Sequence, residues 1–408
     1  MRPKHLHVFK NRRVLLLQGP VGPFFRRFAT DIEGIGATVY KVNFNAGDSF
    51  FYPNGYAFKQ PLTHLEEYLL ELVETNQIDT VVMFGDCRPI HMISKEALKN
   101  HGIQILVFEE GYLRPNHITL ESHGVNGYSQ LSKDIADYLI THHDQDTDVP
   151  ATVEIGKTYW HAVWWAIIYY IAAHIGRGRF PNYKHHRPLT MFEGFYWIRG
   201  TWRKWFFKFR ERGLEKEITE RLDQQYFLVP LQLYNDFQIS HHSNFKSIDA
   251  FIDIVMRSFA EHAPKNTYLA LKQHPFDRGY NDYTKLIRQL GEQLKIAERI
   301  FYIHDQYLPT LLKHARGVVV INSTVGLSAI EQFRPVKVCG EAIYNIEHIS
   351  VQESLDEFWN ISETFKPDPI YVHQYLKYLS QHTQHNGSFY RRIPDCGQKT
   401  GVLWSPAD

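Results

Sequence analysis

Residues 107–115 read Val-Phe-Glu-Glu-Gly-Tyr-Leu-Arg-Pro, and this stretch decides how the first half of the chain is expected to fold. The apolar run 103–108 predicts a buried strand that ends at two adjacent carboxylates, Glu109 and Glu110. In an open α/β sheet, ligands bind just beyond the carboxyl ends of the strands. Adjacent carboxylates repel each other, so the pKa of one can rise while the other stays ionised, which suits acid/base or nucleophilic chemistry. A solvated strand end is the alternative that these residues leave open.

Three strand-like runs precede this stretch, at residues 13–18, 38–44 and 80–84, with helical spacing at 62–74 and 94–101. Strands that alternate with helices in this way predict a parallel sheet covered on both faces. Polar side chains lie at or just beyond the ends of the second and third runs, so we expect them at the edge of a cleft: Asn43, Asp86 and Arg88. The segment 116–121 after Arg114 is polar and is expected to line a pocket; within it, His117 fits a general acid or a surface histidine.

The turn after the first strand reads Gln-Gly-Pro-Val-Gly-Pro-Phe-Phe at residues 18–25. Gly19 and Gly22 would let backbone N–H groups approach an anionic or sugar ligand at the start of the next helix. The turn is not a dinucleotide-binding fingerprint, because the third glycine and the ribose-binding acid are missing. A plain tight turn explains it equally well.

The second half of the chain repeats the α/β pattern, with strand-like runs at 226–232, 267–272, 299–303, 317–322 and 336–340. Residues expected to bind a sugar donor stand where these runs end: Gln232, His274 with Pro275, Ser323 with Thr324, and Gly340. A histidine in a proline-fixed turn can donate to a phosphate oxygen, and Ser323 resembles the N-cap of a helix over 327–333, which favours an anion. Ordinary turn and capping roles also fit each motif taken singly.

Length and composition limit the number of domains, the compartment and the classes of partner. A chain of 408 residues is too long for one core and predicts two domains. The formal net charge of +1 gives no general attraction to nucleic acid. The three cysteines, Cys87, Cys339 and Cys396, lie far apart, which indicates a reducing cytoplasm and no metal-ligand spacing. We expect no signal peptide and no transmembrane helix.

The middle of the chain has a different character. Residues 159–171 are apolar and aromatic on nearly every side, and residues 174–216 contain eleven lysines and arginines but only three acidic residues. Tryptophan and tyrosine favour the membrane interface, and lysine and arginine favour anionic headgroups, so we predict an interfacial helical insert. The residues expected to contact the membrane are Trp160, Trp164, Trp165, Trp202, Arg203, Lys204 and Trp205. A helical hairpin packed between two domains is the alternative.

Taken together, the motifs resemble those of bacterial transferases that use CMP-activated sugars. The stretches 18–25, 108–115, 229–232, 273–275 and 322–326 resemble capsule polysaccharide biosynthesis and export proteins of the KpsS/LipB type. The resemblance covers roughly residues 10 to 350 and includes the aromatic insert. It implies a GT-B-like α/β fold, in which two Rossmann-like parallel-sheet domains face a cleft.

The resemblance also implies a reaction. The protein would be a retaining β-Kdo glycosyltransferase that moves Kdo from CMP-β-Kdo to phosphatidylglycerol or lyso-phosphatidylglycerol and starts the linker of a capsular polysaccharide. Glu110 stands where related enzymes carry the aspartate of Glu-Asp-Gly, so it is expected to be the nucleophile, with Glu109 second. His274, Ser323 and Thr324 would hold the CMP phosphate, while Arg114, or Gly19 with Gly22, would hold the Kdo carboxylate or the acceptor. No metal or other cofactor is expected.

The expected organisation follows from these interpretations: an N-terminal Rossmann-like domain at 1–145, the insert at 146–222, a CMP-binding domain at 223–350, and C-terminal helices with a tail at 351–408. The protein is expected to be cytoplasmic and peripheral on the inner face of the cytoplasmic membrane, with other capsule proteins as further partners. Two alternatives remain open. One is a non-catalytic export or assembly factor that binds the lipid-linked polymer, and the other is a transferase that uses CMP-sialic acid.

Overall fold

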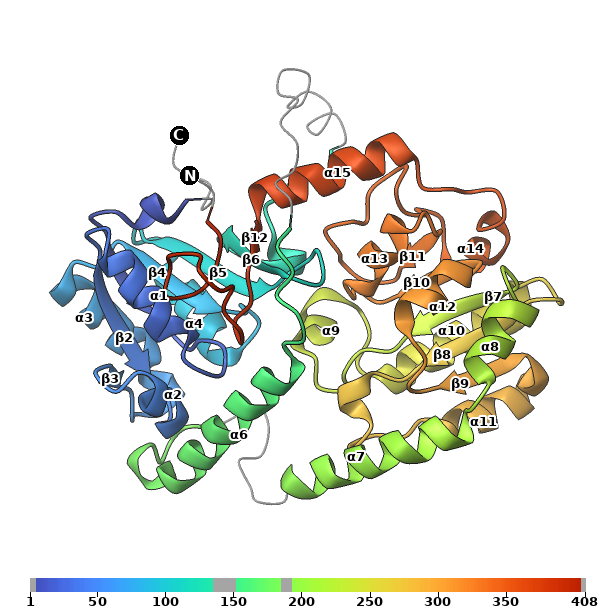
Figure 1. Cartoon of the computed structure of the whole chain (residues 1–408), viewed down its shortest axis with the longest axis horizontal. Coiled ribbons are helices and arrows are strands. Elements are labelled where there is room, and N and C mark those ends of the chain that lie inside the picture. Colours follow the sequence, from blue (N-terminus) through green and yellow to red (C-terminus); the bar gives the residue numbers. More distant parts are fainter. Residues whose placement is uncertain (1–4, 135–151, 185–192, 405–408) are drawn as a thin grey trace. The chain divides into compact units, whose positions relative to one another are not determined.

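The computed structural model describes residues 5–134, 152–184 and 193–404 (Figure 1). Contacts divide the chain into two compact units. Of the described residues, the first unit contains 5–130, 152–184 and 377–404, and the second contains 131–134 and 193–376. Each unit is built around its own sheet, so the expectation of an α/β chain with two mainly parallel sheets is confirmed.

The first unit has a seven-stranded sheet in the order β12-β6-β5-β4-β1-β2-β3. Strands β1 to β5 are parallel to one another, β6 is antiparallel to β5, and β12 is antiparallel to β6 at the edge. The parallel part has the 3-2-1-4-5 order of a Rossmann fold, which places the reversal of strand order between β1 and β4. The strands are β1 Arg13–Leu16, β2 Thr38–Asn43, β3 Tyr56–Ala57, β4 Thr80–Phe84, β5 Gln104–Glu110, β6 His117–Ser122 and β12 Gln384–Asn386.

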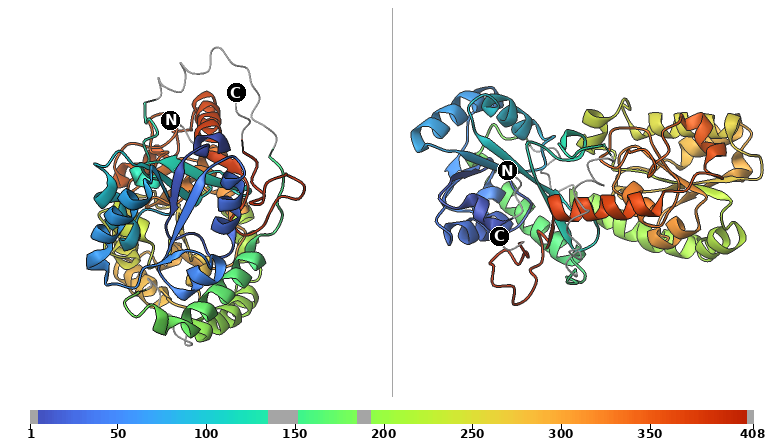
Figure 2. Two further views of the ribbon diagram at one scale, coloured as in Figure 1. Left: turned by 90° about the vertical axis from the view of Figure 1, so that its left-hand side faces the viewer. Right: turned by 90° about the horizontal axis from the view of Figure 1, so that it is seen from above.

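Helices cover both faces of this sheet (Figure 2). Alternate residues of β1, β4 and β5 point to opposite sides, because side chains alternate along a strand. On one face Val14, Leu106 and Phe108 pack with α1 and the C-terminal segment, and on the other Leu15 and Val107 pack with α3 and α4. The helices of the first unit are α1 Phe24–Glu33, α2 Ala46–Phe51, α3 Leu65–Asn76, α4 Pro89–Leu98 and α6 Tyr159–Ile175.

The second unit has a five-stranded parallel sheet in the order β11-β10-β7-β8-β9. Counted from β7, this is again the 3-2-1-4-5 order, with the reversal between β7 and β10. The strands are β7 Tyr226–Pro230, β8 Tyr268–Lys272, β9 Ile300–Ile303, β10 Gly317–Val320 and β11 Val336–Val338. The helices are α7 Glu193–Arg210, α8 Leu214–Lys216, α9 Phe237–His242, α10 Ile248–His262, α11 Thr284–Gln293, α12 Leu308–His314, α13 Val325–Glu331 and α14 Leu355–Ile361, and α15 Pro369–His382 follows.

Several expected elements differ from the structure. The segment 116–121 is largely the antiparallel strand β6 rather than a pocket-lining loop, because Ile118 and Leu120 alternate into the core. Helix α4 begins at Pro89 instead of residue 94, since proline is well suited to a first helical turn. The C-terminal tail, from which little was predicted, supplies β12 and completes the first sheet.

The aromatic insert is not a separate unit, which differs from the expected boundaries at 146–222 and 351–408. Its first helix, α6, packs on α2 in the first unit, and its second helix, α7, belongs to the second unit. Residues 377–404 belong to the first unit again. Among the described helices, none combines the length and apolarity needed to cross a bilayer.

Candidate active site

The two carboxylates of the 107–115 stretch are the last residues of β5, where they pair with Thr119 and Ile118 of β6. They were expected just past the strand, and the antiparallel neighbour extends it by two residues. Their side chains point to opposite faces because successive residues of a strand alternate. The Glu110 Oε1 accepts a 2.9 Å hydrogen bond from the Tyr390 hydroxyl, and the Glu109 Oε1 accepts a 2.9 Å bond from the Glu110 N–H.

Burial raises the pKa of Glu109 to about 7. The hydrogen bond from the Glu110 N–H opposes this rise, whereas the nearby charges of Glu110 and Asp86 add to it. A carboxyl group with a pKa near neutrality is divided between its two protonation states at pH 7, so it can give or take a proton. The main cause is burial, whereas the sequence suggested repulsion between the two adjacent carboxylates.

A polar network occupies the reversal point between β1 and β4. The Gln18 side chain accepts from Arg88 at 3.3 Å and donates to the hydroxyl groups of Tyr183 at 2.9 Å and Tyr169 at 3.3 Å. Tyr169 donates in turn to Asp48 at 3.0 Å. This network ties α6 to the carboxyl edge of the first sheet, and Arg88 lies at that edge as predicted.

Asp86 and Asn43 lie inside the first unit rather than at an open edge. Asp86 is fully buried, forms a 2.9 Å ion pair with Lys95 and accepts from the Val125 N–H. Asn43 is also fully buried and donates to the Tyr52 carbonyl at 2.9 Å. Both side chains therefore hold loops in place.

The glycines of the first turn permit close packing. A Cβ on Gly19 would lie 2.7 Å from the Phe25 ring. Gly22 has a φ of +105°, and a Cβ there would meet the Trp165 ring at 3.0 Å. Arg114 is exposed and donates to the Gly111 carbonyl at 3.0 Å.

In the second unit, the predicted donor-binding residues gather at the carboxyl edge of the sheet. Gln232 follows β7 and Asn322 follows β10, on either side of the reversal point, and their side chains are joined by a 3.0 Å hydrogen bond. Gly340 follows β11, where a Cβ would meet the His242 carbonyl at 2.7 Å. Because all five strands are parallel, His274 and Ser323 stand at this same edge.

His274 precedes a short 3-10 turn that Pro275 begins. Its Nδ1 accepts a 3.2 Å hydrogen bond from the Phe276 N–H. The neutral ring therefore carries its proton on Nε2, because Nδ1 is an acceptor. A ring held in this tautomer presents a donor at Nε2, as a phosphate-binding histidine requires.

The predicted N-cap differs by one residue. Helix α13 begins at Val325 and not at 327, and Thr324 occupies the N-cap position without a side-chain capping bond. The Ser323 hydroxyl accepts from the Val325 N–H at 3.3 Å, and the Ser323 carbonyl accepts from the Tyr344 hydroxyl. Both hydroxyl side chains are partly exposed at the start of the helix.

The aromatic insert divides into inward and outward side chains. Trp165 is turned inward and donates to the Tyr390 carbonyl at 3.1 Å, whereas Trp160 and Trp164 on α6 are 70% and 59% exposed. On α7, Arg203 is buried in an ion pair with Asp282, while Lys204 is exposed. Five apolar residues at helical spacing form the outer stripe of α7 and are 63% to 79% exposed: Phe195, Ile198, Trp202, Trp205 and Phe209.

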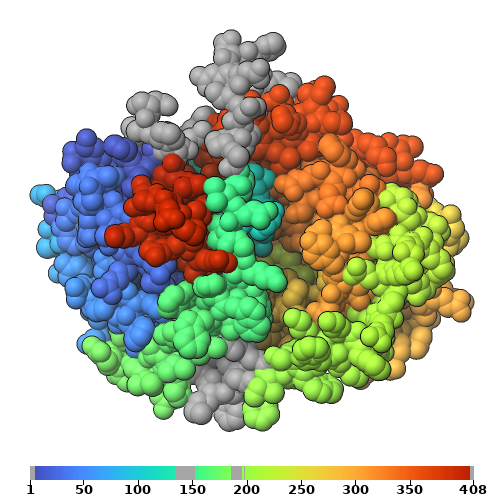
Figure 3. All heavy atoms as spheres, in the orientation of Figure 1, coloured from blue at the N-terminus to red at the C-terminus, as the bar shows by residue number. Residues whose placement is uncertain are grey.

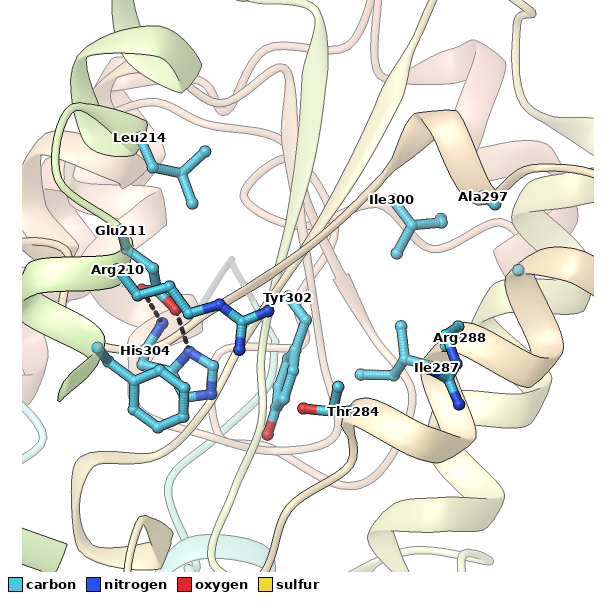
Figure 4. Close-up of a pocket in the computed structure, with 12 residues that line it drawn as sticks. Arg210, Glu211, Leu214, Thr284, Ile287, Arg288, Ala297, Ile300, Tyr302 and His304 are labelled. Carbon is cyan, nitrogen blue, oxygen red and sulfur yellow. Dashed lines mark hydrogen bonds and ion pairs between the residues drawn. The ribbon is translucent and has the colours of Figure 1, made fainter. Parts of the chain in front are cut away.

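The opposite face of α7 packs on the second unit. Phe207 stacks on His304 with ring centroids 3.4 Å apart, and the His304 Nδ1 is bonded to Glu211 at 2.5 Å. A pocket of about 370 Å³ lies beside this pair, with Arg210 and Arg288 among its lining residues (Figure 4). None of the predicted donor-binding residues lines it.

Sequence reasoning missed two tyrosines, one that contacts Glu110 and one in the polar network around Gln18. Tyr390 binds Glu110 from a segment almost three hundred residues away, which joins the first sheet through β12. Tyr169 was counted as part of an apolar helix, although its hydroxyl is buried among polar groups. The one signal in the sequence was the residue type, because a buried tyrosine hydroxyl usually has a hydrogen-bond partner.

Each of the two α/β units thus places polar side chains where the parallel strands of its sheet end. The sequence profile described as "Capsule polysaccharide biosynthesis protein" matches residues 79–390. The chain belongs to this family.

Individual relatives agree with this assignment. The chain is 39% identical over 391 residues to the capsule polysaccharide export protein KpsS of Escherichia coli, covering 94% of this chain and 98% of that protein. It is also 39% identical to the capsule polysaccharide modification protein LipB of Neisseria meningitidis serogroup B, covering 96% and 95% of the two chains. Among solved structures, the β-Kdo 2,7-transferase KpsC of Thermosulfurimonas dismutans is similar with a TM-score of 0.41 and 12% identity, over 89% of this chain and 99% of that one.

Proposed function

We propose that the protein is a glycosyltransferase that moves β-Kdo from CMP-β-Kdo to a phosphatidylglycerol-type lipid with retention, which starts the linker of a capsular polysaccharide. The observation that carries this proposal is the carboxylate pair at the end of β5. Glu109 has a pKa raised to about 7, and Glu110 is oriented by the Tyr390 hydroxyl. Membership of a capsule biosynthesis family supports the same conclusion.

The proposed reaction has two displacements. A Glu110 oxygen attacks the anomeric carbon of Kdo, the bond to the CMP phosphate breaks, and CMP leaves with the electron pair. The lipid hydroxyl then attacks the same carbon, its proton passes to solvent water, and the bond to the Glu110 carboxylate breaks with its electron pair returning to Glu110. Two inversions give net retention. Because Glu109 and Glu110 point to opposite faces of β5, only one of them is expected to be the nucleophile.

Residues at the carboxyl edge of the second sheet would stabilise the departing CMP. The His274 Nε2–H would donate to the phosphate, and the Ser323 and Thr324 hydroxyls would add hydrogen bonds where α13 begins. The Gln232–Asn322 pair would hold the nucleoside from the adjacent strand end. In this proposal, hydrogen-bond donors of the protein stabilise the negative charge of the departing CMP.

The lipid acceptor calls for contact with the membrane, and we assign it to the outward residues of α6 and α7. The stripe Phe195, Ile198, Trp202, Trp205 and Phe209 lies opposite the face that packs on the second unit. Interfacial aromatic side chains and nearby cations both favour an anionic bilayer. Replacing Trp202 and Trp205 by alanine should reduce binding to phosphatidylglycerol vesicles at least tenfold, whereas Ile254→Ala, an exposed apolar change on α10, should leave it unchanged.

The test of the transferase is a mass spectrum of the lipid after incubation with CMP-Kdo, generated in situ, and a short-chain phosphatidylglycerol. A lipid one Kdo heavier is expected with the wild type and with the controls Glu66→Gln and His101→Ala. Glu110→Gln and His274→Ala should form little or none. If the protein transferred sialic acid from CMP-sialic acid but no Kdo from CMP-Kdo, it would still be a transferase, but its donor would be CMP-sialic acid.

The Escherichia coli relative KpsS is named an export protein, which favours a second candidate function. This is a non-catalytic assembly factor that binds the lipid-linked polymer. It would bind lipid but transfer no sugar from either donor, and its binding would not depend on His274.

A further inference from the structure

We propose that the first unit holds the phosphate of an anionic lipid headgroup in a cationic pocket between α1, the first turns of α6 and residues 390–399. This inference rests on the proposed function, because it assigns a binding site to the lipid acceptor. The pocket has a volume of about 480 Å³. Four cationic side chains line it: Arg27, Arg391, Arg392 and Lys399.

The wall that carries three of these cations is fixed to α1. The Asp31 carboxylate accepts the Lys399 N–H at 2.6 Å, the Thr400 N–H at 2.8 Å and the Thr400 hydroxyl at 2.6 Å. Asp31 lies one helical turn beyond Arg27 and would be its natural partner on the helix. Because Asp31 holds the C-terminal segment instead, the positive charge of Arg27 is left for another anion.

The four cations lack counter-ions in the part of the chain that the structure describes, where none forms an ion pair or a side-chain hydrogen bond. Arg27 is half-buried, and Asp395 is the single carboxylate among the lining residues. Burial and the charge of Arg392 both lower the pKa of Arg27. Gathering like charges in a hollow is unfavourable, and a bound phosphate offsets the repulsion with charge-assisted hydrogen bonds.

The remaining wall indicates a lipid as the source of the phosphate. His161 and Trp165 of α6 line the pocket, and Trp160 and Trp164 are exposed on the same turns. Tryptophans of this kind lie at the level of the headgroups in a bilayer. Figure 3 shows the C-terminal segment, in dark red, on the surface of the first unit beside the green segment that leads to α6.

One residue of the pocket also contacts Glu110 of β5. Tyr390 lines the pocket and makes two hydrogen bonds. Its backbone carbonyl accepts from Trp165 at 3.1 Å, and its side-chain hydroxyl donates to Glu110 at 2.9 Å. A headgroup bound against Tyr390 therefore contacts the residue that orients the proposed nucleophile. This connection makes Tyr390 a positioning residue.

The test is a titration followed by fluorine NMR of the full-length protein labelled with 5-fluorotryptophan. The chain has eight tryptophans, and the Trp165→Phe variant assigns the resonance at the pocket. The probes are dihexanoyl-phosphatidylglycerol below its micelle concentration and inorganic phosphate. The variants are Arg27→Gln with Arg392→Gln, and the control is Arg26→Gln, which removes an exposed charge from the same helix.

We expect dihexanoyl-phosphatidylglycerol to shift the Trp165 resonance saturably, and the double variant to weaken this binding about tenfold or more. Arg26→Gln should change it less than about twofold. No shift, or an unchanged affinity in the double variant, would overturn the proposal. Equal affinity for inorganic phosphate would overturn the lipid assignment. The titration contains no sugar donor, so its outcome is separate from that of the transfer assay.

Discussion

Replacing Glu109 by glutamine should make the first unit more stable at alkaline pH and leave it nearly unchanged at acidic pH. The Glu109 pKa is raised from 4.5 to about 7 by burial. Between these values the folded chain keeps a proton that the unfolded chain has lost, so the free energy of unfolding of the wild type falls as pH rises. Glutamine has no charge to bury and can still accept from the Glu110 N–H.

The size of the effect follows from the shift. A displacement from 4.5 to about 7 corresponds to about 3 kcal/mol once pH exceeds the folded-state pKa. Glu109→Gln should therefore match the wild type near pH 4.5 and exceed its unfolding free energy by about 2–3 kcal/mol at pH 8. Glu66→Gln on the exposed face of α3 should show no such trend.

The assay is urea unfolding between pH 4.5 and 8, read by hydrogen-exchange mass spectrometry of peptides from β5 and β6. Peptide-level readout separates the first unit from the second, which is needed because a two-unit chain need not unfold in one step. A constant difference between Glu109→Gln and wild type across this range would refute the reasoning. So would a variant that becomes relatively less stable as pH rises, since Glu109 would then be a stabilised carboxylate.

Three further predictions concern stability and packing. The buried Lys272 has a pKa lowered to about 8 by burial, so the unfolding free energy of the second unit should rise by up to about 3 kcal/mol between pH 8 and 10.5, and Lys272→Met should abolish this rise in urea unfolding. Asp282→Asn leaves the Arg203 charge buried and should destabilise the second unit by about 1–3 kcal/mol, whereas Asp253→Asn at an exposed ion pair should change it by less than about 1 kcal/mol in the same assay. Tyr169→Phe removes the hydroxyl that donates to Asp48 and should increase proteolytic cleavage within α6, reflecting a loss of about 1–3 kcal/mol; undiminished protection would show that the hydroxyl does not hold α6.

Much of the fold could be predicted because buried parallel strands leave apolar runs that end at recognisable residues. The run before Glu109 and the run at residues 317–320 are examples, and both are strands. Elements with weak local signals were missed: β12 has only three residues and gains its stability from pairing with β6. The sequence also does not indicate that α6 belongs to the first unit and α7 to the second, because this depends on which surface each helix covers.

The candidate site was predictable in part for the same reason. Residues at strand ends, such as Glu110, Gln232 and His274, are placed by the strands themselves. Their partners come from elsewhere in the chain, and Tyr390 is the clearest case. Whether an aspartate is an open ligand or a buried anchor also depends on the loop around it, which is why Asp86 was expected at the cleft edge and lies in the interior.

The measurement that tests the central claim most directly is a peptide mass spectrum of the protein after incubation with CMP-Kdo in the absence of a lipid acceptor. The account predicts a Kdo adduct on Glu110, absent in Glu110→Gln, present in Glu109→Gln, and lost when phosphatidylglycerol is added. Formation of the lipid product without any adduct, or an adduct on another residue, would contradict the double displacement at Glu110.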